Sequence, residues 1–150
     1  MKKLVSLGII LLIVSFSSSA SDDLVKYKSH YSVKKTADRF ENIIKSKGFT
    51  LFARIDHQKN ANAVNLALRP TEVVIFGNPN VGTLLMQCAQ DVAIDLPQKV
   101  LVSEDANNQV WLSYNNLSYL KKRHNIEGCE VVLNKISGVL SQLSKATVAP

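Results

Sequence analysis

Residues 68–79 have the sequence L-R-P-T-E-V-V-I-F-G-N-P. No polar side chain interrupts residues 73–76, a pattern typical of a strand covered on both faces and too short for an independent helix. Gly77 permits a turn, Asn78 is a favourable helix N-cap, and Pro79 suits the first helical position, where no amide donor is needed. The stretch predicts a central strand that ends in a tight loop and leads into a helix.

The segments on either side carry alternating patterns typical of strands or 3.6-residue spacings typical of helices. Thr36 is the expected cap of the first helix, Gly48 its expected end, and Gly128 breaks the chain before the last helix. A hairpin turn suits residues 105–108, because asparagine tolerates positive φ. We expect strands at 24–33, 49–57, 73–76, 99–104 and 110–115, helices at 36–47, 58–65, 79–89, shortly after Asn116 and at 130–145, and a connection at 91–97.

This order of elements predicts an α+β fold. Residues 21–150 would form a single small domain, in which helices pack on a mixed β-sheet of about five strands. In the second strand, simple alternation places the odd-numbered apolar residues of 49–55 on one face and Phe52 and Arg54 on the other.

The first twenty residues have the layout of a secretory signal peptide. Lys2 and Lys3 give a basic start, residues 4–16 are apolar apart from Ser and Gly, and small residues lead to a cleavage position after Ala20. A retained membrane helix needs about 20 apolar residues, and residues 4–16 are fewer than that. An uncleaved anchor is therefore the second alternative. We expect a periplasmic or secreted domain with no membrane contact after cleavage.

The charge distribution argues against nucleic acid as a partner. The whole chain has 18 basic and 12 acidic residues, and loss of Lys2 and Lys3 leaves 16 against 12, or a net charge of +4. The one dense basic cluster is residues 121–123, and no aromatic residues interleave with it as in RNA-binding proteins. A solvated helix face is the preferred interpretation.

Cys88 and Cys129 are the two cysteines of the chain. In an oxidising compartment they could form a disulfide worth about 4 kcal/mol in the chain-entropy model. Cys88 also follows Leu84 and Leu85 at helical spacing, so it could instead be a small buried apolar residue. The sequence leaves both alternatives open.

Six separated segments agree in order and spacing with one known family. They are G-F-T-L-F-A-R-I-D-H (48–57), L-R-P-T-E-V-V-I-F-G-N-P (68–79), G-T-L-L-M-Q (82–87), D-L-P-Q-K-V-L-V (95–102), V-W-L-S-Y-N-N (110–116) and the pair Arg123-His124. Over residues 33–142 the chain resembles the family known as domain of unknown function 302. The resemblance implies a small α+β fold and a homodimer, and it assigns no catalytic role to any residue.

Polar residues gather where the expected strands and helices end, which is where binding groups often lie. The turn at 78–83 would present free backbone amides to an anion, although helix capping alone explains its sequence. If these residues bind something, we expect a small anionic or organic ligand. The candidate binding residues are Arg54, Asp56, His57, Arg69, Asn78, Thr83, Tyr114, Asn115 and His124.

An enzyme is the alternative hypothesis. Asp56 could orient His57 as a general base, with Arg54 or Arg69 as a charge partner, provided that all of them line one pocket. Capping of a helix by Asp56 is the simpler interpretation. The histidines and cysteines lack the short spacings of a metal site, and no motif calls for a cofactor.

The sequence therefore favours a non-enzymatic, exported homodimer that binds a small ligand or a partner protein. A purely structural dimer, whose polar residues are caps and ion pairs, is the further alternative. The sequence does not identify the ligand.

Overall fold

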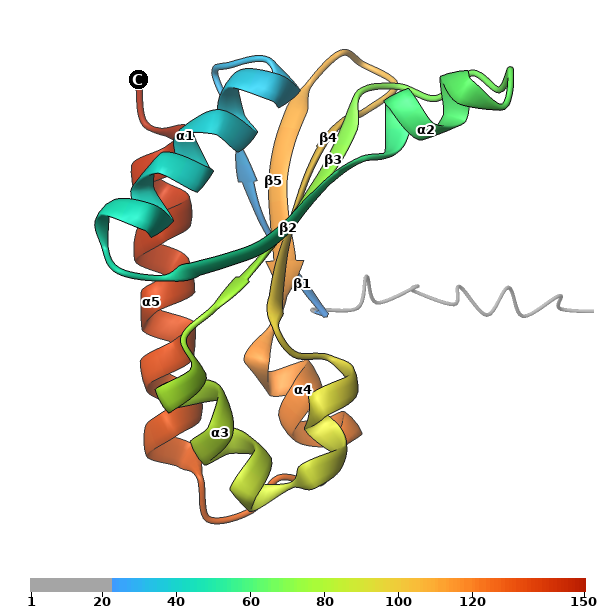
Figure 1. The fold of residues 1–150 in the computed structure, drawn as a ribbon. Helices are drawn as coiled ribbons and strands as arrows, with labels where there is room; N and C mark the ends of the chain where they lie inside the picture. Colours follow the sequence, from blue (N-terminus) through green and yellow to red (C-terminus); the bar gives the residue numbers. More distant parts are fainter. Residues whose placement is uncertain (1–22) are drawn as a thin grey trace, which may run out of the picture.

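Five strands form one sheet in the computed structural model, which describes residues 23–150 (Figure 1). The strands are β1 (Leu24–Lys28), β2 (Thr50–Asp56), β3 (Thr71–Gly77), β4 (Gln98–Glu104) and β5 (Val110–Asn115). The helices are α1 (Val33–Ser46), α2 (His57–Ala63), α3 (Pro79–Cys88), the 3-10 helix η1 (Gln90–Ile94), α4 (Leu117–Arg123) and α5 (Glu130–Val148). The predicted α+β class is confirmed.

The sheet order is β1-β5-β4-β3-β2, and every neighbouring pair is antiparallel. The expectation of a mixed sheet was wrong. A parallel pair needs a crossover that returns the chain to the starting end of the sheet. Here α2, the α3–η1 segment and the 105–109 turn each connect two neighbouring strands at one end, so β2 to β5 run back and forth. Strand β1, which α1 connects to β2 at the far edge, pairs antiparallel with β5.

Helices α1 and α5 lie side by side on one face of the sheet, which buries that face (Figure 1). Along β3, Glu72, Val74 and Phe76 are buried, whereas Val73 and Ile75 on the other face are only half-buried. The central strand is thus covered on one face, not on both as its apolar run suggested. An antiparallel sheet tolerates such an open face because it needs no crossover helices there.

Strand β2 departs from simple alternation. Its pairing with β3 shifts between Leu51 and Ala53, so Phe52 is an extra residue in a β-bulge. Leu51 lies opposite Phe76, while beyond the bulge Arg54 lies opposite Val74. Because the bulge reverses the alternation, Leu51 and Arg54 share the helix-covered face, contrary to the prediction.

The first helix begins earlier than its sequence suggested. Ser32 is the N-cap of α1, and its hydroxyl accepts a hydrogen bond from the backbone amide of Lys35 at 3.3 Å. Thr36, the expected cap, is buried inside the helix and shares a 2.7 Å hydrogen bond with Ser29. Strand β1 consequently stops at Lys28. Gly48 follows α1 with φ +75°, as expected of a helix stop.

The other expected turns and caps take their predicted places. Asn78 accepts a hydrogen bond from the amide of Asn80 at 3.0 Å, Pro79 opens α3, and Asn116 caps α4. Asn108 adopts positive φ in the hairpin turn. The expected connection at 91–97 contains η1.

The predicted signal peptide, residues 1–20, lies outside the described residues. Within residues 23–150, no helix has both the length and the apolar character needed to cross a bilayer.

Candidate functional site

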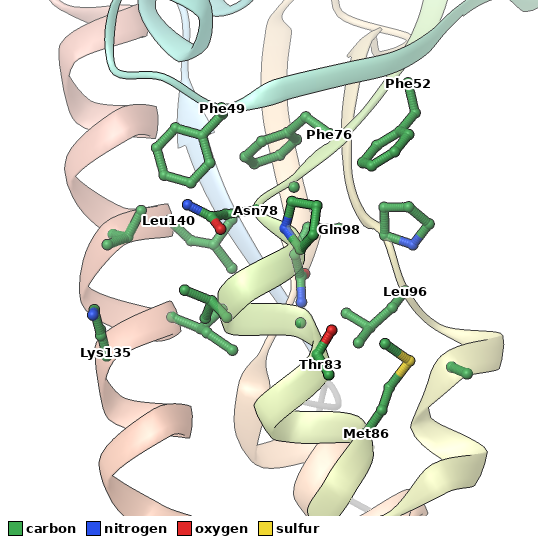
Figure 2. A pocket seen from close by; sticks show the side chains of 18 residues that line it. Phe49, Phe52, Phe76, Asn78, Thr83, Met86, Leu96, Gln98, Lys135 and Leu140 are labelled. Atoms are coloured by element: carbon green, nitrogen blue, oxygen red, sulfur yellow. The ribbon is translucent and has the colours of Figure 1, made fainter.

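A pocket of about 410 Å³ opens where α3 and α5 meet the end of the sheet. Figure 2 shows Phe49, Phe76 and Phe52 beside the sheet, Thr83 and Met86 on α3, and Leu140 on α5. Its volume falls within the roughly 300–1,000 Å³ typical of small-molecule sites. The described residues therefore contain a cavity of the right size for a small ligand.

The turn at Gly77–Asn78–Pro79 creates this space. Pro79 and the cap at Asn78 start α3 directly at the end of β3, so the helix leaves the sheet. Leu85 is the one buried residue of α3, whereas Val81 and Met86 are only half-buried. Gly82 adds to the gap, since a Cβ there would still lie 4.0 Å from the Leu96 side chain.

Gln98, the first residue of β4, is the buried polar group of the pocket. It is only 9% exposed, and its Nε2 atom has no hydrogen-bond partner among the described residues. It lies opposite Phe76 in the β3–β4 register. Buried amide groups are nearly always paired, so an unpaired one in a cavity calls for an explanation. Ser144 Oγ, the other unpaired buried side-chain atom, lies on α5 outside the pocket lining.

Phenylalanines line the sheet side of the pocket. Phe76 packs edge-to-face with Phe49 at 5.9 Å between ring centroids, and with the core residue Phe40 at 5.0 Å. The ring of Phe52, which the bulge turns outward, is 51% exposed. This wall is anchored to the core at Phe76 and reaches solvent at Phe52.

Two of the predicted binding residues, Asn78 and Thr83, line this pocket. The backbone amides at the start of α3 were expected to be open to an anion, but the Asn78 side chain occupies that of Asn80. Asn78 therefore acts first as a cap. The candidate residues at the other strand ends, Asp56, His57, Tyr114 and Asn115, do not contribute to the lining.

Arg54 holds a cluster of carboxylates under α1. Its guanidinium donates to Glu72 at 2.6 Å, to Asp38 at 2.6 Å and to Glu41 at 3.2 Å. Burial acts to lower the pKa of Arg54, but the hydrogen bonds to Glu72 and Asp38 outweigh it and raise that pKa. Because its guanidinium is paired with these three carboxylates, Arg54 has a structural role. It does not line the pocket.

Asp56 and His57 lie at the opposite end of β2 from the pocket. Asp56 caps α2 by accepting a 2.8 Å hydrogen bond from the Lys59 amide, and His57 is an exposed first residue of that helix. Arg69 donates to the backbone of Glu104 at 3.1 Å and lines a separate shallow pocket that includes neither Asp56 nor His57. The enzyme hypothesis required all of these groups in one pocket, and that condition is not met.

Tyr114 and Asn115 lie apart from the pocket as well. Tyr114 is a buried core residue stacked on Tyr27 with ring centroids 6.3 Å apart, and burial raises the pKa of its hydroxyl. Asn115 ends β5 opposite Leu24. Neither residue lines either of these two cavities.

His124 belongs to a pair that local sequence patterns did not reveal. Its Nε2 atom lies 2.5 Å from a carboxylate oxygen of Asp95, and both side chains are largely buried. Arg123 approaches the same carboxylate at 3.6 Å. The contact joins the segment after η1 to the end of α4, so two motifs separate in sequence meet in space. The basic residues 121–123 are exposed, as expected.

Cys88 and Cys129 are joined in a disulfide, with Cα atoms 6.4 Å apart. The bond ties the last residue of α3 to the N-cap of α5. These two helices line the pocket, so the crosslink holds its two helical walls together. In residues 23–150, no group of three or more His, Cys, Asp or Glu side chains is arranged to hold a metal ion.

Sequence reasoning missed most of the pocket. Gln98 was not selected because a polar residue opening a strand is unremarkable in sequence, and Phe49 and Phe76 were expected to be ordinary core residues. One signal was present: in Q-K-V-L-V at 98–102, Gln98 alternates with Val100 and Val102, which puts it on the same face as two apolar residues. Only the tertiary structure shows that the amide nitrogen is buried without a partner among the described residues.

Comparison with known proteins places the chain in one family. The family described as Domain of unknown function DUF302 matches residues 25–143, and the chain belongs to it. A crystal structure of an uncharacterized conserved DUF302 protein from Bacillus stearothermophilus superposes with a TM-score of 0.76. That match covers 85% of this chain and 99% of the other at 16% identity, so it supports the fold alone.

Longer curated proteins contain a similar segment. The chain is 40% identical over 110 residues to proteins named fluoride-specific ion channel FluC 1 from Brucella suis biovar 1 (strain 1330) and from Brucella abortus biovar 1 (strain 9-941). The match covers 73% of this chain but only 43% and 41% of those two proteins. The similar segment is thus less than half of each relative.

Proposed function

We propose that the chain is an exported, homodimeric domain that binds a small, mostly apolar molecule in the pocket between α3, α5 and the end of the sheet. The observation that carries this proposal is the cavity itself, which has a volume of about 410 Å³ and is lined mainly by aromatic and aliphatic side chains.

The name of the longer relatives does not describe this pocket. Fluoride is a small anion that needs several hydrogen-bond donors or cations around it. The cavity is instead wide and lined mainly by phenylalanines and aliphatic side chains, and Lys135 is the one charged residue that the described part of the chain adds to its lining. We therefore do not extend fluoride conduction to this domain.

Export rests on the first twenty residues of the sequence, together with the disulfide. A bond between Cys88 and Cys129 persists in an oxidising compartment such as the periplasm or the outside of the cell. N-terminal sequencing of the protein recovered from its native host would test cleavage after Ala20. Retention of residues 1–20 in the membrane fraction would favour the uncleaved anchor.

The homodimer is supported by the open face of the sheet. Val73, Leu101 and Trp111 lie on that face and are only half-buried, which leaves apolar surface for a second copy. Sedimentation at micromolar concentration should give twice the mass of the chain. Leu101→Lys on the open face should yield a monomer. The control Val131→Lys should remain a dimer, because Val131 lies on α5 and is 83% exposed. A monomeric wild type would refute the dimer.

A pocket-filling variant tests the ligand-binding function. Val139 lines the pocket from α5, and Val139→Trp would occupy its space. In a thermal-shift screen, some small apolar compounds should stabilise both the wild type and the control Val131→Trp. The same compounds should not stabilise Val139→Trp. If no compound stabilises the wild type, or if Val139→Trp responds equally, the pocket is not the binding site.

A further inference from the structure

The polar residues of the pocket that a ligand can reach lie at its mouth. The unpaired amide nitrogen of Gln98 is buried and inaccessible to a ligand, and the side-chain oxygen of Asn78 caps α3. Thr83 and Lys135 are the two exposed polar residues in the lining. The interior therefore offers apolar contacts, and a polar group of the ligand finds its partner at the mouth.

Lys135 is the one charged residue that the described part of the chain adds to this lining. It lies on α5 and is exposed, although it lines the cavity. Figure 2 shows it at the edge of the group of lining side chains. A lysine in such a place packs its apolar stem along the wall and keeps its ammonium group in water. The mouth of the pocket thus carries a positive charge.

This charge has no carboxylate partner on its own helix. The positions three and four residues away from Lys135 along α5, at 131, 132, 138 and 139, are occupied by Val, Val, Gly and Val. Glu130, the one acidic residue of α5, pairs with Lys121 at 3.0 Å. None of the ion pairs within residues 23–150 includes Lys135. Its ammonium group is therefore available to an anion.

The start of α3 adds a field of the same sign. The first turn of this helix lines the pocket and contains no acidic residue, so its positive dipole end is not neutralised there. Asn78 already accepts hydrogen bonds from the amides of Asn80, Val81 and Gly82, so the helix contributes its field and no free donor. The lining contains no carboxylate for an ammonium ligand. The mouth thus favours an anion over a cation.

The interior sets the rest of the ligand. At about 30 Å³ per atom, the share of a water molecule in the liquid, 410 Å³ holds roughly a dozen non-hydrogen atoms. A charged group buried among the phenylalanines would lose its hydration without gaining a partner. A single lysine also matches one negative charge, whereas a phosphate monoester carries nearly two. The ligand that fits is apolar over most of its length and ends in one carboxylate.

We infer that the pocket takes a small amphiphilic carboxylate, whose apolar tail fills the cavity and whose carboxylate pairs with Lys135 at the mouth. This inference rests on the proposed ligand-binding function and names its ligand class. Lys135 is then the residue that selects the charge of the ligand, while the apolar walls provide most of the affinity.

Three probes with the same tail test the inference: octanoate (a carboxylate), octanol (a neutral alcohol) and octylamine (a cation at neutral pH). Titration calorimetry of the mature protein at neutral pH and physiological salt should show octanoate binding about threefold more tightly than octanol, the effect of one exposed ion pair. Octylamine should bind more weakly than octanol. All three should lose binding to Val139→Trp, which fills the pocket.

Two variants of Lys135 test the role of the charge. Lys135→Met keeps an unbranched apolar stem, and octanoate should lose its advantage over octanol. Lys135→Glu should reverse the order, so that octylamine binds more tightly than octanoate. The matched control is Lys122→Glu, the same change of charge at an exposed position of α4 outside the lining, which should keep the wild-type order. Circular dichroism and thermal unfolding would establish that the variants fold.

The outcomes separate the two proposals. If octanol or octylamine binds the wild type as tightly as octanoate, or if Lys135→Glu keeps octanoate first, the inferred ligand class is wrong while the pocket remains a binding site. The same conclusion holds if Lys122→Glu changes the order as much as Lys135→Glu does. If none of the three probes binds the wild type, the inferred class is also wrong. The broader thermal-shift screen then decides separately whether the pocket binds any apolar molecule.

Discussion

Two helices, α1 and α3, are attached to the rest of the domain in different ways. Helix α1 buries five residues against the sheet and α5: Val33, Thr36, Ala37, Phe40 and Ile44. Helix α3 buries only Leu85, and a disulfide at its last residue ties it to α5. Packing is continuous beneath α1, whereas a cavity remains beside α3.

The polar groups beneath the two helices differ in the same way. Under α1, the Arg54 guanidinium is within 3.2 Å of three carboxylates, so the polar groups of the cluster satisfy one another. Beside α3, the Gln98 amide has no partner among the described residues. A satisfied cluster contributes to the fold, while an unpaired buried amide costs stability. The predictions below test this distinction.

Loss of the disulfide should have the largest effect. Replacing Cys88 and Cys129 together by Ser should lower the free energy of unfolding by about 4 kcal/mol, since it frees a segment of 41 residues in the unfolded chain. Urea unfolding of the oxidised wild type and the double variant measures this difference. Reductant added to the wild type should give the same loss. Equal stability of oxidised wild type and variant would mean that α3 needs no crosslink.

The next effect should come from the Arg54 cluster. Arg54→Met should destabilise the protein by about 3 kcal/mol, because it leaves the Glu72 carboxylate buried without a counter-charge. The Asp38 side chain is 42% exposed and stays hydrated in this variant, so its lost ion pair adds little to the destabilisation. The double variant Arg54→Met/Glu72→Leu should recover most of the loss. A change below about 0.5 kcal/mol in the single variant would place the cluster with ordinary surface ion pairs.

Acid should weaken the same cluster to a smaller extent. Hydrogen bonds from Lys34 and then Arg54 lower the pKa of Asp38, and those from Lys45 and then Arg54 lower the pKa of Glu41. These carboxylates are harder to protonate folded than unfolded, so their stabilisation is complete above their ordinary pKa of about 4 and is lost as the pH falls through the lower folded pKa.

Unfolding measured from neutral pH to about pH 3 should show this acid loss in the wild type. Arg54→Met should show a shallower one, because one of the partners that lowers each pKa is gone. The lysine partners Lys34 and Lys45 remain, so part of the acid dependence should persist. An unchanged slope in the variant would mean that Arg54 does not set the titration of Asp38 and Glu41.

In contrast to Arg54, Gln98 should be replaceable at a gain in stability. Gln98→Leu should raise the free energy of unfolding of the ligand-free protein by about 1 kcal/mol, because it removes an unpaired buried polar group. Gln87→Leu, at its exposed site, should change it by less than about 0.5 kcal/mol. Clear destabilisation by Gln98→Leu would show that the amide has a partner and is part of the packed core.

The smallest effect concerns the space beside α3. Gly82→Ala should stabilise the protein by about 0.5 kcal/mol, because the residue is helical and the added Cβ lies 4.0 Å from Leu96. Gly48→Ala has the opposite expected sign, with a loss of about 1 kcal/mol, because φ is +75° there. Thermal unfolding of both variants measures the pair. A loss of stability at Gly82 would mean that α3 is packed more tightly than its neighbours indicate.

Local patterns in the sequence were sufficient to predict the elements and many of their ends. The caps at Asp56, Asn78 and Asn116, the helix stop at Gly48 and the hairpin turn each depend on residues within four positions of one another. The start of α1 was misplaced by a few residues because Ser32 and Thr36 are both good caps. The choice between them depended on Ser29, which pairs with Thr36 in the folded protein.

The site was less accessible from sequence. Asn78 and Thr83 were predicted because they belong to a recognisable turn, and both line the pocket. Arg54 was predicted as a binding residue because a charged side chain near a strand end resembles one. The carboxylates that neutralise it come from α1 and β3, and the bulge at Phe52 turns it toward them.

The sequence alone determined the α+β class, because apolar periodicity and capping residues act over a few neighbouring positions, and six matching segments carried the resemblance to the DUF302 family. The tertiary structure decided that the sheet is antiparallel with one open face, that Arg54 is neutralised, and that Gln98 is buried without a partner. These three features depend on contacts between residues distant in the chain. The volume left between two packed elements has no counterpart in any local pattern.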